Sequence, residues 1–395
     1  MLLGIHLQLL VGPEVPVPAP APLTEALVGI EATLSDEGPS GFQLTFPAGR
    51  SGPTDLLDHP VLASPLLRPF NRVILIVTFN AVPRVLMDGF ITRTQLAPND
   101  EPGTSTFTVT GEDISVVMDL IENKFPHPAM AESVIATTVL ARYTQYLLLP
   151  PIVVPPVTID SPPPTESIPT QGGSTDRAYL NELARRFGHT FFVTAGPLPG
   201  QNVAYWGPPV RGGLPQPALS VNMGPESNVD SISFGFDGMA PTTVVDVHQD
   251  STTGVPLPVV APVSTRFPPL AAFPAPVANL LPHRRISTLN IPDRVDGSDP
   301  PSRGGMTLVQ AIRQAQAKVD ASVDKVVSAT GELDALRFGD LLTPRGIVGL
   351  RGAGFANDGL YYVQSVSHSI RSGSYKQRFT LTREGVGATT PVVRP

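Results

Sequence analysis

Short stretches in which apolar and polar residues alternate fill the first 122 residues, and clusters of proline, glycine, asparagine and aspartate separate them. Alternation with a period of two is typical of strands with one buried face, and the intervening clusters favour turns. The pattern predicts a small antiparallel β-barrel or sandwich over residues 1–122. Strand character returns at residues 226–250 and 322–385, where we expect a second, discontinuous β-barrel. The fold class predicted is therefore mainly β, with α+β insertions.

Three segments depart from this pattern and place apolar residues at helical spacing. The second of them also begins with Ser174 and Thr175, residues typical of an N-terminal cap, and ends at Gly188, where a left-handed C-terminal cap is expected. We expect a smaller α/β domain over residues 123–225, a proline-rich crossing with a helix over 251–321, and a C-terminal tail over 386–395. The apolar sets are Ile135, Val139 and Tyr143; Tyr179, Leu183 and Phe187; and Leu308, Ile312, Ala315 and Val319.

Composition limits the functions open to the chain. Its 46 prolines and 35 glycines among 395 residues indicate many turns and crossings, and the absence of cysteine excludes disulfides, thiolate zinc sites and cysteine nucleophiles. Charged residues make up 15% and the net charge is −7, which argues against nucleic acid or an anionic membrane as the main partner. No apolar run approaches the length of a membrane-spanning helix, and the apolar N-terminus is interpreted as a first strand.

Sequence motifs for chemistry are few. The seven histidines have no spacing that would place two on one strand or helix face, and neither a nucleophile elbow nor a phosphate-binding loop occurs. We therefore predict no cofactor and no metal. The sequence does not exclude that two of the 34 acidic residues meet in space and act as a catalytic acid and base. Trp206 is expected to pack against neighbouring prolines.

Two segments, residues 86–113 and 357–384, echo each other. Each begins with Asp-Gly, continues as a β-branched strand, turns, and returns as an alternating strand whose inward positions include Phe107 or Phe379. The echo is compatible with a duplicated barrel domain and also with chance, because Asp-Gly turns are common. The hairpin residues expected to be structural are Asp88, Gly89, Phe107, Asp358, Gly359, Tyr362, His368, Tyr375 and Phe379.

His368 is the one group in the second hairpin that could carry chemistry. It alternates with Val366 and Ile370 along the expected strand. A strand histidine paired with a neighbour is the ordinary outcome, so we interpret His368 as structural.

The C-terminal motifs resemble the phage late control protein D or tail-hub family of contractile tails, type VI spikes and extracellular contractile injection systems. The resemblance also covers residues 85–120 and 175–193, and the proline-rich crossings at 147–170 and 253–282 match nothing in it. The motifs are Arg345-Gly346, the run Asp358–Val363, the run Val366–Ile370, and Tyr375, Phe379, Leu381 and Arg383.

The resemblance implies a structural baseplate hub with two related tube-like barrels per chain. Three copies would form a homotrimer with a pseudo-sixfold ring that adapts a threefold spike to a sixfold inner tube. The implied partners are a separate spike protein, since the chain ends soon after the last expected strand, an inner tube protein and other baseplate proteins. The resemblance also implies that the protein assembles in the bacterial cytoplasm into a tail or injection particle. It implies no catalytic reaction. The alternatives are a tail-tip hydrolase that degrades the cell envelope and a secreted carbohydrate-binding β-protein.

Overall fold

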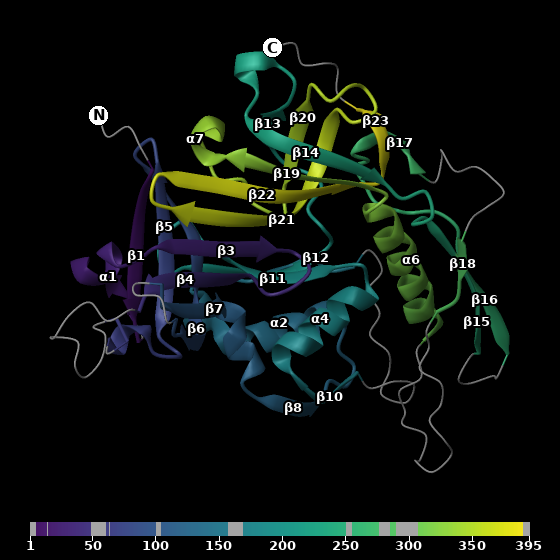
Figure 1. Ribbon diagram of the computed structural model, residues 1–395. Coiled ribbons are helices and arrows are strands. Elements are labelled where there is room, and N and C mark those ends of the chain that lie inside the picture. Colours follow the sequence, from purple (N-terminus) through teal and green to yellow (C-terminus); the bar gives the residue numbers. More distant parts are fainter. Residues whose placement is uncertain are drawn as a thin grey trace.

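The computed structural model describes residues 5–13, 15–48, 61–62, 64–99, 104–156, 169–249, 255–275, 285–289 and 307–389. One sheet of 13 strands dominates it, so the predicted mainly β class with α+β insertions is confirmed (Figure 1). The strands along the hydrogen-bonded path are β14 (Val229–Phe236), β19 (Val327–Asp334), β22 (Ser374–Arg383), β21 (Gly359–Arg371), β3 (Gly29–Ser35), β4 (Gly41–Pro47), β7 (Thr106–Asp113), β6 (Val82–Ala97), β5 (Arg72–Phe79), β1 (His6–Gly12) and β2 (Val17–Pro18), with β20 (Ile347–Arg351) and β13 (Gln216–Ser220) branching from β21.

Two separate hydrophobic cores lie against this sheet. The first core is formed mainly by β1 and β3 to β7, which we call the first β-unit. The second is formed mainly by β13, β14 and β19 to β22, the second β-unit. The two units are joined by strand pairing, because the C-terminal half of β21, from Ser365 to Arg371, pairs with β3. Tyr375 of β22 reaches into the first core, so the two units share side chains as well as strands.

A third core belongs to an α/β unit between the two β-units in sequence. Thr175 caps the N-terminus of α4, and Gly188 has a φ of 63°, as the capping pattern predicted. Trp206 is fully buried and packs edge-on against His189, with 4.7 Å between ring centres; its packing against prolines stays a prediction. The elements are η3 (Ile114–Asp119), β8 (Glu122–Pro126), α2 (Glu132–Leu140), η4 (Ala141–Tyr143), α3 (Thr144–Leu147), β9 (Ile152–Val153), β10 (Thr170–Thr175), α4 (Asp176–Arg186), β11 (Thr190–Ala195) and β12 (Asn202–Gly207).

A fourth core lies between α6 (Leu308–Asp324) and a small sheet of β16 (Pro256–Ala261), β15 (Thr242–Gln249) and β18 (Arg285–Ser287). These elements project to one side of the main sheet (Figure 1). The predicted apolar face of α6 is wrong at Ile312, which is 45% exposed. The buried stripe runs through Ala311, Ala315 and Val319, and Ile312 lies about 100° further round the helix than Ala311.

The remaining elements complete the chain. The first predicted strand is present as β1, and β23 (Gly385–Ala388), at the start of the expected tail, pairs with β17 (Ala271–Pro274). No helix in the described part of the chain is both long and apolar enough to cross a membrane. The short helices are α1 (Ala21–Glu25), η2 (Pro65–Leu67), η5 (Gly224–Glu226) and α7 (Ala335–Phe338).

Candidate functional surface

One face of the main sheet carries polar side chains continuously across both β-units. Directly opposed residues of neighbouring strands share a face, so the strand registers define rows of side chains across the sheet. Together, these rows cover the eight strands from β14 to β6. Three of them are Ser233, Thr330, Thr380, Ser365 and Ser35; Ser231, Glu332, Arg378, Ser367 and Thr33; and Asp334, Lys376, Ser369, Glu31, Gln43, Thr110 and Arg93.

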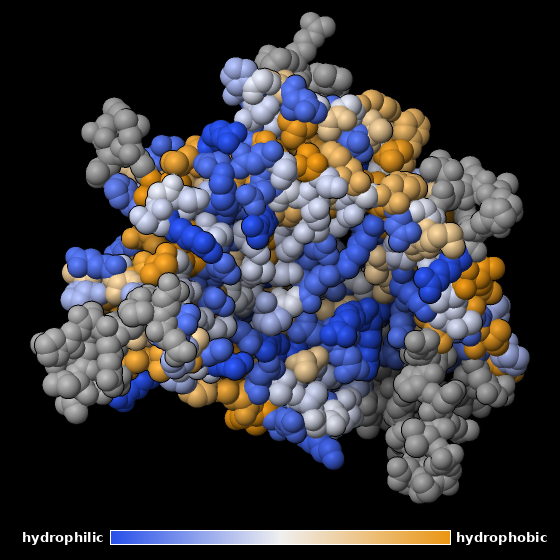
Figure 2. Space-filling model, viewed as in Figure 1, coloured by the Kyte–Doolittle hydropathy of each residue, from blue (hydrophilic) through white to orange (hydrophobic). Residues whose placement is uncertain are grey.

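Serine and threonine dominate this surface, which we call the hydroxyl face. The row positions are exposed or half-buried, whereas the intervening residues of the same strands are mostly in the two cores. At the seam between the units, the hydroxyls of Thr33 and Ser367 lie 2.8 Å apart and form a hydrogen bond. In Figure 2 the region over β22, β21 and β3 is coloured mainly white and blue, and orange residues gather toward the rim.

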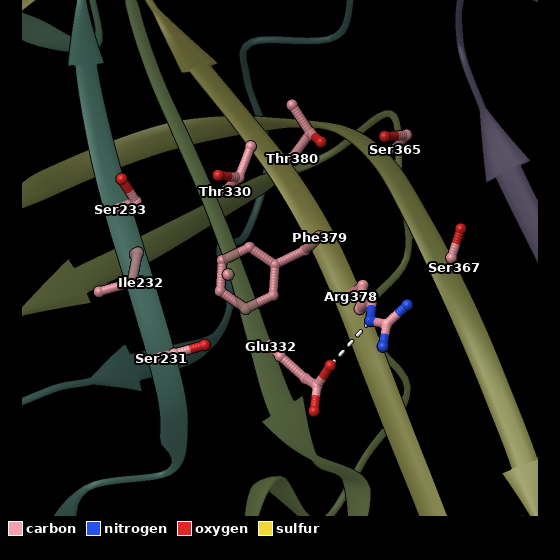
Figure 3. Close-up of a pocket in the computed structure, with 11 residues that line it drawn as sticks. Ser231, Ile232, Ser233, Thr330, Glu332, Ser365, Ser367, Arg378, Phe379 and Thr380 are labelled. Atoms are coloured by element: carbon pink, nitrogen blue, oxygen red, sulfur yellow. Dashed lines mark hydrogen bonds and ion pairs between the residues drawn. The ribbon is translucent and has the colours of Figure 1, made fainter.

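The hydroxyl face is hollowed over the second β-unit. A shallow groove of about 510 Å³ lies across β14, β19, β22 and β21. Its lining is rich in hydroxyl groups, with Glu332 and Arg378 at one end (Figure 3). Gly331 forms part of the lining, and a Cβ atom there would lie 2.6 Å from the ring of Phe379. Glycine at this position therefore lets the Phe379 ring pack directly against the strand.

Four charged residues of this face over the second β-unit, Glu332, Arg378, Asp334 and Lys376, form ion pairs. Arg378 donates to Glu332 at 2.7 Å, and Lys376 contacts Asp334 at 3.0 Å and Asp230 at 2.8 Å. These pairs hold opposite charges next to each other, so the face offers hydrogen-bond partners without a strong field of one sign. Within the described residues, no group of three or more histidine, aspartate or glutamate side chains could hold a metal ion.

The two predicted hairpins are both present, as β6–β7 and β21–β22, and each contains a register shift. Their Asp-Gly pairs differ, however. Asp358-Gly359 lies where β21 begins, and Gly359 has a φ of 121°. Asp88-Gly89 lies inside β6, because the strand extends back to Val82, so the two pairs occupy different positions along their strands.

Asp88 joins the first β-unit to the α/β unit. Its carboxylate accepts two hydrogen bonds from Arg72, at 2.7 and 2.8 Å, and one from the side chain of Asn202 at 3.0 Å. Gly89 next to it is required sterically, since a Cβ atom there would lie 2.0 Å from the carbonyl oxygen of Glu112. Asp358 has a different, local role and accepts from the backbone N–H of Ala353 at 2.8 Å.

The other predicted hairpin residues are buried side chains. Phe107 and Tyr375 are in the first core, Phe379 is in the second, and Tyr362 is in a small cluster with Leu270 and Ile347. None of them faces the groove with a free polar group. Their assignment as structural positions stays a prediction, which a Phe379 variant tests at one of them.

His368 is 1% exposed and lies on the core side of β21. Its Nδ1 hydrogen bonds with the Tyr375 hydroxyl at 2.9 Å, and its Nε2 has no partner among the described residues. Burial lowers the pKa of His368 to about 3, because a charged imidazole would have to leave water. The side chain is therefore neutral at physiological pH.

His368→Gln is expected to reduce the sensitivity of the fold to acid. A buried histidine with a lowered pKa stabilises the fold fully above its unfolded pKa near 6.5, and this contribution is lost as pH falls toward 3. Between pH 6.5 and 3, the unfolded state binds one more proton at this histidine than the folded state. The unfolding free energy therefore falls by up to about 1.4 kcal/mol per pH unit. Urea denaturation of the parent and the variant at pH 7.5, 5.5 and 4.5 measures the difference in slope.

The control is His6→Gln, at an exposed position of β1. It is expected to unfold like the parent at all three pH values. Equal slopes for the parent and the His368→Gln variant would show that His368 is not held neutral by burial. At pH 7.5 we expect the His368→Gln variant to be only mildly destabilised.

Sequence reasoning missed a buried charged cluster where the three units meet. Arg345, 9% exposed, donates to the backbone oxygen of Ser35 and to the Ser40 hydroxyl, the latter at 3.1 Å. Its guanidinium lies 3.9 Å from the centre of the Phe192 ring, in the α/β unit. The backbone of Arg345 is left-handed, with a φ of 68°, and no local sequence signal marks that conformation.

Two carboxylates accompany Arg345. Burial raises the pKa of Asp36 to about 6, and Arg345 opposes this effect. Burial also raises the pKa of Asp113, which accepts hydrogen bonds from the backbone N–H groups of Ser40 and Ser115, both at 2.8 Å. Asp113 thereby caps the N-terminus of η3.

Comparison with known proteins identifies the fold. No protein-family model and no curated protein matches the sequence. Among solved structures, a tail protein from Neisseria meningitidis MC58 is 13% identical, with a TM-score of 0.61 over 97% of this chain and 98% of its own. The 43 kDa tail protein of prophage MuSo2 from Shewanella oneidensis is 12% identical, with a TM-score of 0.61 over 96% of this chain and 99% of its own.

A third structure extends the likeness beyond phage tails. The E. coli c3393 protein is a component of the type VI secretion system with structural similarity to the T4 bacteriophage tail proteins gp27 and gp5. It is 11% identical, with a TM-score of 0.54 over 93% of this chain and 77% of its own. The chain therefore shares its fold, end to end, with phage tail proteins, and the likeness in fold that the C-terminal motifs indicated is confirmed.

Proposed function

We propose that this protein is a structural baseplate hub of a contractile tail or injection system. The observation that carries the proposal is the end-to-end likeness in fold to two tail proteins of nearly equal length. The hydroxyl face supports it, because a broad neutral surface suits contact with, or passage of, other macromolecules better than catalysis on a bound small molecule. We propose that the protein works through its interfaces, without an active site.

The proposed assembly is a homotrimer. Two β-units in each chain give six units in a trimer, and such a ring can meet a sixfold inner tube on one side and a threefold spike on the other. The continuous sheet supports this arrangement, because it holds the two units of one chain side by side at a fixed angle. The proposed partners are a spike protein, an inner tube protein and other baseplate proteins.

The purified protein, alone or with its spike, is expected to have the mass of three chains in multi-angle light scattering. Co-expression with candidate spike and tube genes from the same cluster should yield a complex with three hub chains, three spike chains and six tube subunits. A stable monomer in both settings would contradict the trimer. If the protein also binds neither partner and hydrolyses a cell-wall polysaccharide by itself, the hydrolase replaces the hub as the proposed function.

A further inference from the structure

We propose that the small sheet of β15, β16 and β18 binds an amphipathic α-helix of another protein in the same particle. The helix lies on the face of this sheet that is turned away from α6, which we call the valine face. Only the assignment of the helix to a protein of the particle rests on the hub function proposed above. The docking surface itself follows from the side chains of the three strands.

The two faces of the small sheet differ in what covers them. Side chains alternate between the faces along each strand, and residues opposite each other in the register share a face. On one face Val244, Val259 and Ala261 are at most 3% exposed, and they form one core with Ala311 and Ala315 of α6. α6 therefore covers that face, and the valine face is the opposite one.

The valine face is apolar and open. Val245 is paired directly with Val260, and Thr243 is paired with Ile286. In Figure 2 orange residues gather over this sheet, at the right-hand edge of the view. Contiguous exposed apolar surface of about 300–600 Å² commonly marks an interaction site. Four aliphatic side chains on the valine face are between 43% and 69% exposed, namely Val245, Val247, Val260 and Ile286.

The described outward positions of the three strands carry no charged side chain. Besides the four aliphatic residues they are Thr243, Pro256 and Pro258. Asp246 of β15 lies on the α6 side, where it accepts a hydrogen bond from the backbone N–H of Leu289 at 2.6 Å. A charge brought against the valine face would lose its water without gaining a partner. The surface that docks here must therefore be apolar as well.

The edges of the small sheet are poorly suited to pair with a further strand. β16 forms one edge, and Pro256 and Pro258 lack the N–H donors that a new strand would use. β18 forms the other edge and is only three residues long. An extended segment laid flat on the valine face would bury its own backbone N–H and C=O groups without partners. A helix satisfies these groups internally, so it can cover the face with its side chains alone.

The size of the valine face also fits one helix. Strands lie about 4.8 Å apart, so three strands are about 10 Å wide, close to the diameter of a helix. α6 occupies the matching width of the opposite face through Ala311, Ala315 and Val319. The docked helix would carry aliphatic residues at positions i, i+3, i+4 and i+7, and would complete a helix–sheet–helix arrangement.

The same size favours a partner that other contacts already hold nearby. A stable contact between two free globular proteins takes about 20–30 residues from each of them, far more than this sheet presents. A protein held in the same particle by its other interfaces needs only a small additional surface, because its local concentration is high. The small sheet projects to one side of the main sheet, where such a partner can reach it (Figure 1).

Photo-crosslinking in the assembled particle tests the proposal. The photoreactive amino acid p-benzoylphenylalanine replaces Val247 in the full-length protein, which is expressed with the other genes of its cluster, and the particles are irradiated after purification. We expect a covalent product with another particle protein, in which mass spectrometry places the link on the apolar stripe of an amphipathic helical segment. The control carries p-benzoylphenylalanine at Leu214, which is 96% exposed before β13, and should not give this product.

Two lysine variants give an independent measurement. Val247→Lys and Ile286→Lys each place a charge on the valine face, from different strands. The amount of the cross-linked partner recovered with the particle should fall about tenfold or more, because the docked helix would bury that charge. Both positions are exposed, so thermal unfolding should stay close to that of the parent. The matched control is Val134→Lys, at an exposed position of α2, which should recover the partner like the parent.

The outcomes separate this proposal from the hub function. A link within the same chain, a link to a second copy or to a non-helical segment, or no link in assembled particles would overturn the docked helix and leave the hub intact. Unchanged recovery of the partner with both lysine variants would overturn it too. If the helix is linked at position 247 but the protein forms neither a trimer nor a complex with spike and tube, the docking surface is supported and the hub function fails.

Discussion

Phe379→Asp is expected to unfold the second β-unit. Phe379 is 3% exposed in the second core, and its ring lies against Gly331 of the neighbouring strand. Replacing it with aspartate removes a large apolar side chain, which costs about 3–5 kcal/mol, and buries a carboxylate without a partner, which adds to that cost. The sum is comparable to the whole stability of a domain of about 5–15 kcal/mol. The measurement is soluble yield together with thermal unfolding followed by circular dichroism.

The matched control is Thr380→Asp, the same change one residue further along β22. Thr380 points to the hydroxyl face and lines the groove, so water can solvate the new carboxylate. We expect this variant to stay folded and to lose about 1 kcal/mol or less. If both variants fold equally well, the inward and outward faces of β22 are assigned incorrectly.

Arg345→Met should be the second large effect, because Arg345 connects the two β-units and the α/β unit. Methionine keeps much of the apolar volume but leaves the Ser40 hydroxyl, Asp36 and Asp113 without the cation. Removing one member of a buried charged group typically costs about 3–5 kcal/mol. Urea unfolding at pH 7 measures the loss, and limited proteolysis should find new cleavage between the units.

A pH series separates the charge effect from lost packing. Because a carboxyl whose folded pKa is raised stabilises the fold below its unfolded pKa and loses this contribution as pH rises, the parent already loses some stability as pH rises from about 4 to 6 through Asp36. Without Arg345 the pKa of Asp36 rises further, so the loss should continue to higher pH. Arg378→Met, at a side chain that is 76% exposed, is the control and should unfold like the parent at every pH, because water screens its ion pair.

Local patterns in the sequence predicted most of the elements. Period-two alternation identified the strands of both hairpins, and Thr175 with Gly188 marked the ends of the segment around α4. These signals work because they depend on neighbours within one strand or helix turn. The error at Ile312 has the same origin, because a helix pattern gives the spacing of a stripe but not which of two adjacent stripes meets the sheet.

Local sequence patterns could not predict the features that depend on contacts between residues far apart in the chain. The pairing of β3 with β21 joins residues more than 300 positions apart, and nothing in either strand specifies the other. The hydroxyl face follows from that register, since its rows exist only once the strands are aligned. Arg345 was noted as part of a motif, but its burial depends on Ser40 and Phe192 from two other units. The contact between the rings of Trp206 and His189 likewise depends on residues that are not neighbours in the sequence.

The seam between β3 and β21 also determines when this chain can finish folding as it is made. Thr33 and Ser367, which meet there, are 334 residues apart, and Tyr375 completes the core of the first β-unit. At about 5–20 residues per second, a ribosome needs roughly 20–70 s to synthesise the intervening chain. During that interval β3 has one uncovered edge and the first core lacks an aromatic ring. The N-terminal part of the protein therefore waits for the C-terminal part, and a truncated chain would expose a sheet edge open to aggregation.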